Sequence, residues 1–288
     1  MDYKKINDEF YSSNYWTIDR SRYKWFSKYV KAKIIKKFIK SLKNKEVLYD
    51  AGGGVGNWGS YFIKDFKKII VSDISKIALK KIPEKEIVRV QCNVLKNKLP
   101  SKSVDCIILM DVFEHIDEKD LLTMMKDFKR ILKKEGRILI YTSLRGWGFG
   151  SIRQRIFNSK KRLLGNEHEE GHVNRLTYDE FKELFEKSSL NIDDYYFYSI
   201  FFQQFTDAIK DRFARFSSHL LGKEREDKAI GRAGQSIKEN LRKKEERNIF
   251  KIPFFVLSWV SYLDILLFGK LIKGNSIFLS LKVEENQI

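Results

Sequence analysis

The chain has 288 residues, of which 43% are hydrophobic and 14% aromatic, so it can build a sizeable core and is not a wholly disordered protein. Its 56 Lys and Arg exceed its 38 Asp and Glu, and the net charge of +18 suits nucleic acid, an anionic membrane, an acidic small substrate or a Lys-rich surface without a partner. Two cysteines exclude a disulfide scaffold and residues 1–10 lack the apolar run of a secretion signal, so we expect a reducing, cytoplasmic location.

The first predicted element is a long amphipathic helix within residues 20–45. Eleven Lys or Arg and no acid lie in this stretch, and its apolar residues recur at helical spacing as one wide stripe. We expect this helix to pack on the domain with its lysines in water. The alternative is a helix that lies on a membrane surface or binds a partner.

Short apolar segments then alternate with helical segments. The pattern predicts strands at 46–50, 68–73, 87–92, 104–110, 137–142 and 191–202, and helices at 55–64, 75–81, 119–133 and 177–187. Gly136 is expected to end the third of these helices, and Thr177 with Glu180 forms a capping-box pattern at the start of the fourth. Strands that alternate with helices predict a parallel sheet with helices on both faces.

The alternation stops after residue 202. Residues 203–248 are polar, charged and helix-prone, residues 253–268 are very apolar, and residues 276–283 alternate like a final strand. The apolar segment is slightly short for a membrane span and contains Asp264, which favours a buried or capping helix. Insertion into one membrane leaflet is the alternative.

A glycine-rich turn follows the first predicted strand in the segment VLYDAGGGVGNWG, residues 47–59. Glycines at such a turn let the backbone bend tightly and approach a ligand closely. The spacing after Asp50 is D-x-G-x-G-x-G and differs from the G-x-G-x-x-G of dinucleotide-binding proteins.

Polar residues also follow the next three predicted strands. Asp73 ends the second strand, 23 residues after Asp50, where a carboxylate can accept both hydroxyls of a ribose. Asn93 follows the third strand, where its amide could read an adenine edge, and MDVFEHIDE (110–118) follows the fourth. Ligands bind at the carboxyl ends of strands in open parallel sheets, so all four places are candidate site positions.

Together these motifs resemble those of the class I S-adenosylmethionine-dependent methyltransferases. DAGGGVG resembles the first motif of the family, and three later segments resemble its later blocks: QCNVLKNKLPSKSVDCIILMDVFEHI, LKKEGRILIYT and GHVNRLTYDEFKELFEKSSLNI. The resemblance spans roughly residues 46–200. Three positions depart from the family pattern, since Asn93, Glu135 and Ser189 replace a usual Asp, Pro and Gly, but the glycine loop is intact.

The resemblance implies an α/β, Rossmann-like sheet of seven strands, mostly parallel with an antiparallel last strand, with helices on both faces. It also implies a helical insertion before the last strand. The expected organisation is an N-terminal lid and basic helix (1–45), a methyltransferase core (46–202), a helical insertion with an apolar helix (203–275), and a final core strand and tail (276–288).

The resemblance further implies S-adenosyl-L-methionine as cofactor and assigns residues to it. The expected cofactor-binding residues are Asp50, Ala51, Gly52, Gly53, Gly54, Gly56, Asp73, Ile74, Asn93, Val94 and Asp111, with Asp111 beside the methyl group. Trp16 and Arg20 lie in a segment similar to one that closes over the cofactor in relatives. Arg145 and His172 are the expected residues on the substrate side.

Methyl transfer needs a base only where the acceptor must lose a proton, and His115 is the candidate. The alternative is that His115 packs or caps its loop. A further alternative joins Asp111, Glu114 and His115 as ligands of a divalent cation such as Mg²⁺.

The stretch from 137 to 166 holds several Arg and Lys, no acid and interleaved glycines, so it is a candidate basic lid at the substrate entrance. We therefore expect methyl transfer, by O- or N-methylation, to an anionic small-molecule or lipid-linked acceptor. The basic helix and the apolar segment could also contact the inner, anionic membrane surface. The alternatives are an RNA methyltransferase and a non-catalytic cofactor-binding protein.

Overall fold

A computed structural model describes residues 8, 11–12, 26–145, 173–198, 200 and 248–284. Several sequence predictions fall outside these residues: the lid residues Trp16 and Arg20, the substrate-side His172, the part of the basic stretch that follows Arg145, and residues 203–247 of the helical insertion.

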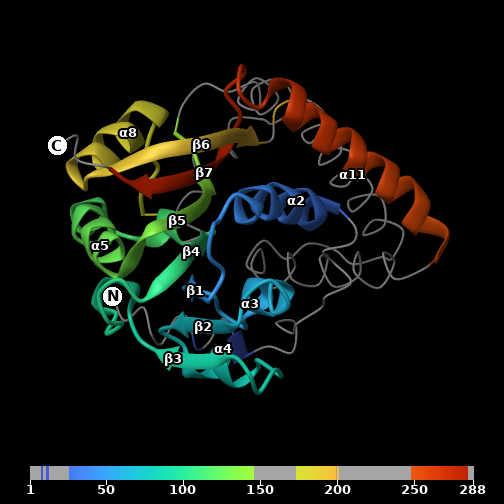
Figure 1. Cartoon of the computed structure of the whole chain (residues 1–288). Helices are drawn as coiled ribbons and strands as arrows, with labels where there is room; N and C mark the ends of the chain where they lie inside the picture. Colours follow the sequence, from blue (N-terminus) through green and yellow to red (C-terminus); the bar gives the residue numbers. More distant parts are fainter. Residues whose placement is uncertain are drawn as a thin grey trace, which may run out of the picture.

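Seven strands form one sheet in the order β3-β2-β1-β4-β5-β7-β6 (Figure 1). The strands are β1 (Val47–Ala51), β2 (Lys68–Asp73), β3 (Val88–Gln91), β4 (Val104–Met110), β5 (Leu132–Ser143), β6 (Leu190–Tyr198) and β7 (Ser276–Val283). Strands β1 to β5 pair in parallel, whereas β7 runs antiparallel to both β5 and β6. The predicted seven-stranded sheet with an antiparallel last strand is confirmed.

The burial of the central strand β4 shows that the sheet is covered on both faces. All seven of its residues are buried, as expected of a parallel strand between two layers of helices. Its one charged residue, Asp105, accepts hydrogen bonds from the Val47 backbone nitrogen at 2.9 Å and from Lys133 Nζ at 3.0 and 2.9 Å. The buried carboxylate is therefore paired, which removes most of the penalty of burying a charge.

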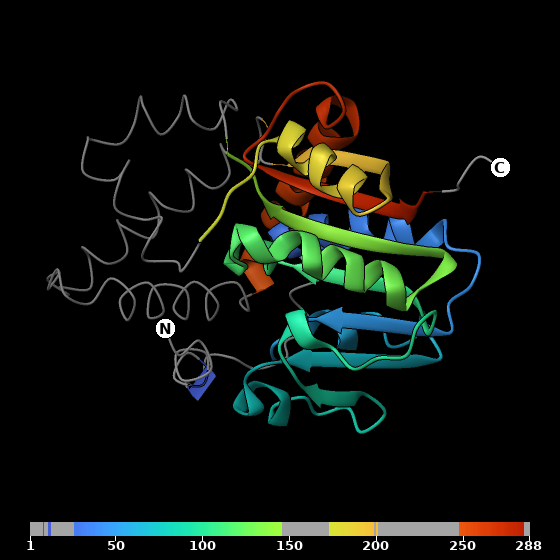
Figure 2. The ribbon, with the colours of Figure 1, turned by 90° about the vertical axis from the view of Figure 1, so that its left-hand side faces the viewer.

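Helices cover the two faces unequally. The described helices are α2 (Phe26–Lys40), α3 (Asn57–Tyr61), α4 (Lys76–Lys80), α5 (Glu118–Ile131), α8 (Tyr178–Lys187) and α11 (Asn248–Phe268), with short 3₁₀ turns η2 (Val94–Lys96) and η3 (Phe113–His115). Buried residues of α2, α3, α4 and α11 share one core cluster with the sheet, and those of α5 and α8 share the other. Figure 2 shows α5 (green) and α8 (yellow) across the face turned to the viewer.

The boundary between α5 and β5 differs from the sequence prediction. The helix ends at Ile131 and β5 begins at Leu132, so Gly136 lies inside a strand and does not end the helix. A Cβ on Gly136 would lie 2.8 Å from the Asp105 carbonyl oxygen and 2.7 Å from Leu132 Cδ1. The glycine is therefore needed for close approach to β4, next to an irregularity in the β4–β5 register.

Two further predictions concern the segment around α8. The capping box is confirmed, because Thr177 Oγ1 accepts from the Glu180 backbone nitrogen while the Glu180 carboxylate accepts from the Thr177 nitrogen. Ser189, which replaces the usual glycine, has a φ of 53° between α8 and β6. A left-handed backbone there explains why glycine suits this position.

The apolar helix α11 is half buried over its described side chains, which fits the capping helix of the two expected forms better than the fully buried one. Ser258, Ser261, Asp264 and Ile265 face the protein, while large apolar side chains on the other side are exposed. Among the described residues, no helix combines the length and the apolar character needed to cross a membrane.

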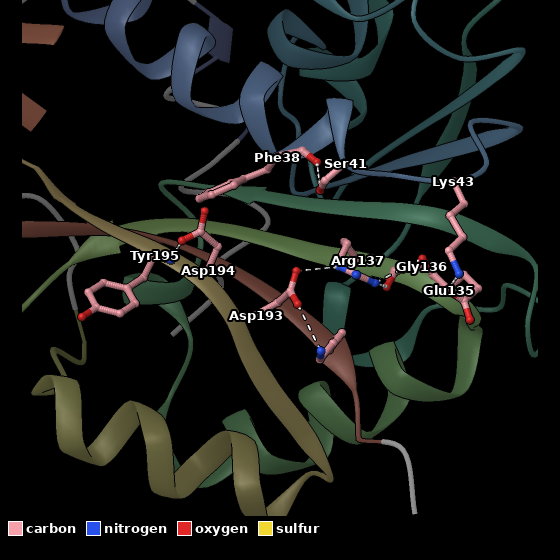
Figure 3. Close-up of polar contacts among 10 residues, drawn as sticks. Phe38, Ser41, Lys43, Glu135, Gly136, Arg137, Asp193, Asp194 and Tyr195 are labelled. Atoms are coloured by element: carbon pink, nitrogen blue, oxygen red, sulfur yellow. Dashed lines mark hydrogen bonds and ion pairs between the residues drawn. The ribbon is translucent and has the colours of Figure 1, made fainter. Parts of the chain in front are cut away.

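An ion-pair network joins β5, β6 and β7 toward the amino end of β5. Arg137 Nε donates to Asp193 Oδ2 at 3.1 Å, and Lys282 Nζ lies 3.2 Å from the other oxygen of Asp193 (Figure 3). Nearby, Lys43 after α2 pairs with Glu135 at 2.8 Å. These contacts lie away from the carboxyl ends of the parallel strands, so they support the fold and leave the opposite edge to the candidate site.

Candidate functional site

The sheet order brings the polar strand ends together. Strands β3, β2, β1 and β4 are neighbours and run in parallel, so their carboxyl ends meet at one edge. Asp50 and Asp73 lie at the ends of β1 and β2, Asn93 follows β3, and Asp111 follows β4. This adjacency is what the sequence analysis expected of a ligand edge.

The glycine loop between β1 and α3 is held by backbone hydrogen bonds. Gly53 nitrogen donates to the Ser72 carbonyl, and Gly56 nitrogen donates to the Gly53 carbonyl, both at 2.9 Å. Gly54 has a φ of 56°, which disfavours other residues, and a Cβ on Gly53 would lie 2.6 Å from Asp50 Cγ. The backbone of Gly52 and Gly53 is partly exposed, with no side chain of its own between it and a ligand.

Asp50 is almost completely buried behind this loop. Its Oδ2 accepts from the Gly59 backbone nitrogen at 2.9 Å. Burial raises the pKa of Asp50 to about 7, and Asp73 adds to this shift, although the bond from Gly59 acts against it. Near neutral pH a positively charged ligand group would favour the carboxylate form.

Asp73 holds the loop and faces the same edge. Its Oδ2 accepts from Gly54 nitrogen at 2.9 Å and its Oδ1 from Ser75 nitrogen at 2.8 Å. Burial raises the pKa of Asp73, against the effect of these two bonds. Each carboxylate oxygen has a second lone pair, so Asp73 can also accept from two hydroxyl groups.

The remaining predicted positions flank these acids. Asn93 Oδ1 accepts from Leu95 nitrogen at 2.9 Å and so caps η2, while the Asn93 side chain stays exposed. Val94 is buried, and Ile74 continues the chain from Asp73.

Two N-terminal residues reach this edge and were missed by the sequence analysis. Asp8 contacts Ser75 Oγ, and the hydroxyl of Tyr11 lies 2.5 Å from where a Cβ of Gly54 would be. Burial, with Asp73 and Asp50, raises the pKa of Tyr11. No local pattern in the sequence pointed to Tyr11, whereas the family resemblance pointed to Trp16 and Arg20.

Lys31 of α2 was also missed, and it lies beside Asp111. Its Nζ is 3.3 Å from both carboxylate oxygens of Asp111 and 3.6 Å from the centroid of the Tyr141 ring in β5. Asp111 has a φ of 57°, and its nitrogen donates to the Tyr141 carbonyl at 3.0 Å. The signal in the sequence was a lysine on the apolar stripe of the helix.

The alternative metal group of Asp111, Glu114 and His115 does not converge. Glu114 is buried and accepts from Thr142 Oγ1 at 2.9 Å, and burial together with Asp111 raises its pKa. His115 is exposed, and Asp111 is paired with Lys31. In the part of the chain that the structure describes, no group of three or more His, Cys, Asp or Glu could hold a metal ion.

The substrate-side Arg145 is exposed and pairs with Glu180 of α8. Val173 and Asn174 bind to η3, because both of their backbone nitrogens donate to the Glu114 carbonyl, at 2.9 and 3.3 Å. The segment after His172 therefore crosses next to His115, as expected if the late block contributes to the substrate side.

The fold and this edge define a Rossmann-like protein with features suited to a ribose-bearing cofactor: partly exposed glycine backbone, a buried carboxylate and a second carboxylate at the next strand. The chain belongs to the methyltransferase family, since a family model described as "Methyltransferase domain" matches residues 20–195.

Solved structures share the fold at low identity. A phosphoethanolamine N-methyltransferase 2 of Haemonchus contortus, bound to S-adenosylmethionine, has a TM-score of 0.59 and 14% identity, with 97% of this chain and 56% of that chain covered. A geranyl diphosphate C-methyltransferase of Streptomyces coelicolor A3(2), in complex with Mg²⁺, geranyl diphosphate and S-adenosylhomocysteine, has a TM-score of 0.54 and 11% identity over 98% of both chains.

This chain spans 65% of a Leishmania major S-adenosylmethionine-dependent methyltransferase (TM-score 0.48, 15% identity, 58% of this chain covered) and little more than half of the nematode enzyme. No curated protein matches the chain significantly.

Proposed function

We propose that this enzyme transfers a methyl group from S-adenosylmethionine to an anionic small-molecule or lipid-linked acceptor. The observation that carries the proposal is the Lys31 ammonium at the carboxyl ends of β4 and β5, where it contacts Asp111 and the Tyr141 ring. Two structures of the same fold, from other proteins, point the same way: one is named for phosphoethanolamine and the other holds geranyl diphosphate. Both are phosphate-bearing acceptors.

We assign the cofactor to the residues at the ends of β1 to β4. In this proposal the glycine loop and Asp50 take the methionine end, Asp73 takes the ribose hydroxyls, and Asn93 with Val94 faces the adenine. When bound, the cofactor supplies an electrophilic methyl group. His115 stays the candidate base, and Trp16, Arg20, Arg145 and His172 stay candidate lid and substrate residues.

Calorimetry and methyl transfer test the function directly. We expect S-adenosylmethionine to bind the purified protein at micromolar concentration, and a labelled methyl group to enter an anionic fraction of a cell extract. The extract is separated into lipid, RNA, protein and small-molecule fractions before counting. Absence of cofactor binding would refute the proposed methyltransferase function. Label in the RNA fraction alone would refute the proposed small-molecule or lipid-linked acceptor.

We further propose that the enzyme works at an anionic membrane surface. The exposed apolar side chains of α11 recur at three- and four-residue spacing and so share one side of the helix: Val256, Trp259, Leu263, Leu266 and Leu267. Beside them lies the lysine-rich α2, where Lys33 Nζ is 5.8 Å from the centroid of the Trp259 ring. Apolar side chains bordered by an aromatic ring and lysines suit the interface of an anionic bilayer.

Vesicle flotation tests this contact. We expect wild type to float with vesicles that contain phosphatidylserine, and the double substitution Leu263→Asp, Leu267→Asp to reduce binding at least tenfold, since each Leu loses about 1.5–3 kcal/mol of burial. Ile77→Asp is the matched control, because Ile77 is an exposed apolar residue on α4. Equal flotation of wild type with purely zwitterionic vesicles, or no flotation at all, would contradict the proposal.

A further inference from the structure

Lys31 lies on the inward side of α2. It shares a stripe with Ile35 and Phe38, both of them buried, and its own side chain is 16% exposed. Lys33 and Lys40 of the same helix are exposed. A lysine on an apolar stripe is uncommon, because burying an ammonium is unfavourable unless it has partners. The position therefore needs an explanation.

Its partners keep the ammonium charged. Burial acts to lower the pKa of Lys31, but the Asp111 carboxylate and Tyr141 outweigh it and hold the pKa above its ordinary value. The Tyr141 ring lies under the ammonium and is itself buried. Glu114 lies near Asp111, and repulsion between these two carboxylates contributes to the raised pKa of Glu114. At neutral pH Lys31 is thus a fixed positive charge paired with the Asp111 carboxylate.

The cluster adjoins the proposed cofactor site. Asp111 begins the turn after β4, and the next residue, Val112, packs on the glycine loop: a Cβ on Gly52 would lie 2.8 Å from a methyl carbon of Val112. An acceptor that reaches a methyl group beside Asp111 must therefore come close to Lys31.

The balance of charge at this place distinguishes acceptor types. Lys31 and Asp111 together carry no net charge, while a sulfonium carries one positive charge. An anionic oxygen brings the sum to zero. A neutral amine leaves it at plus one, and an ammonium raises it to plus two. Lys31 is largely buried, so such differences in charge affect binding more than they would in bulk water.

We propose that Lys31 binds the acceptor through an anionic oxygen, and that this oxygen, from a carboxylate or an acidic hydroxyl, receives the methyl group. The inference rests on the methyltransferase function proposed above and narrows its acceptor to an oxygen acid. A hydroxyl first gives its proton to solvent, which Lys31 favours by stabilising the oxyanion. The oxygen then forms a bond to the methyl carbon, the bond from that carbon to sulfur breaks, and its electron pair stays on sulfur as a neutral thioether.

Benzoate and benzylamine, similar in size and opposite in charge, test the assignment. Each is titrated by calorimetry into protein saturated with S-adenosylhomocysteine. We expect Lys31→Met to weaken benzoate binding about tenfold, the effect of losing one charge-assisted hydrogen bond, and Lys31→Arg to retain most of it. Benzylamine should bind Lys31→Met more tightly than wild type, because Asp111 loses its partner. Lys40→Met is the control. The affinity for S-adenosylhomocysteine should stay within about twofold in all variants, because Lys31 is not among the residues assigned to the cofactor.

Equal benzoate affinity in wild type and Lys31→Met would overturn the inference. Turnover with an isotope-labelled methyl group adds an independent readout, since the chemical shift of the product methyl separates O-methyl from N- and C-methyl. An N- or C-methyl product would overturn the oxygen acceptor and leave the methyltransferase function intact. Failure of wild type to bind S-adenosylhomocysteine would instead refute the proposed function itself.

Discussion

Replacing Asp73 by alanine is expected to weaken S-adenosylmethionine binding about hundredfold, which corresponds to about 2.8 kcal/mol. In the proposed site this carboxylate accepts from two ribose hydroxyls, and hydrogen bonds to a charged group contribute roughly 1.5–3 kcal/mol each. The side chain also holds Gly54 and Ser75 through their nitrogens, so its loss loosens the loop that shapes the site. Calorimetry with purified variants measures the change.

Two further variants separate recognition from folding. Asp73→Asn keeps the volume and one acceptor oxygen, so it should preserve the loop better than alanine while still weakening the cofactor. Asp179→Ala removes an exposed carboxylate at the start of α8 and should leave cofactor affinity unchanged. If Asp73→Ala is folded and binds the cofactor as tightly as wild type, the ribose assignment is wrong.

Much of the sheet could be predicted because its strands carry strong local signals. Strand β4 is an apolar run interrupted only by Asp105, and the glycine loop marks the end of β1. The end of α5 could not be placed, because glycine commonly stops helices. Here Gly136 serves a tertiary contact with Asp105 instead, and no local pattern reveals such a contact.

The half-buried state of α11 shows a second limit. Its sequence is apolar all round, so hydrophobic periodicity does not distinguish the inner from the outer side. The inner side carries the small residues Ser258 and Ser261, which let the helix approach its neighbours, and the larger Leu263 and Leu267 point outward. Packing geometry rather than hydrophobicity therefore decides which side is buried.

The sequence predicts the proposed cofactor site better than the proposed acceptor site. The proposed cofactor positions Asp50, Asp73 and Asp111 follow predicted strands, so the local pattern together with the family resemblance pointed to them. Lys31 lies 80 residues from its partner Asp111, and only the packing of α2 on the sheet brings them together. The one signal in the sequence was a lysine at a core position of the helix. This signal is hard to recognise because the helix contains many other lysines.

The stability of the protein without cofactor is expected to fall as pH rises from about 4 to 7, chiefly because of Asp50. The carboxyl has a pKa of about 7 in the folded state against an ordinary value of 3.8. Between these values the folded state binds more protons than the unfolded state, so the free energy of unfolding decreases with rising pH. A difference of about three between the two pKa values corresponds to about 4 kcal/mol, and this contribution to stability is lost once the pH exceeds the folded-state pKa.

Asp50→Asn should remove most of this pH dependence. The amide keeps the shape and an acceptor for Gly59, but it does not ionise, so we expect the variant to unfold at higher urea concentration than wild type at pH ~8 and at a similar one at pH ~4. Part of the slope should persist, because burial also raises the pKa of Asp73 and of Glu114. If the free energy of unfolding changes with pH equally in wild type and Asp50→Asn, the pKa of Asp50 in the folded protein is close to the ordinary value, which contradicts this prediction.

The same shift links protons to the cofactor. S-adenosylmethionine carries an ammonium and a sulfonium, and a positive charge near Asp50 favours the carboxylate, so binding at pH ~6 should release a proton and affinity should rise between pH ~6 and ~8. Calorimetry in buffers of different ionisation enthalpy counts the released protons. Asp50→Asn should bind the cofactor more weakly and release fewer of them. Proton uptake by wild type in the same experiment would place the positive groups of the cofactor away from Asp50.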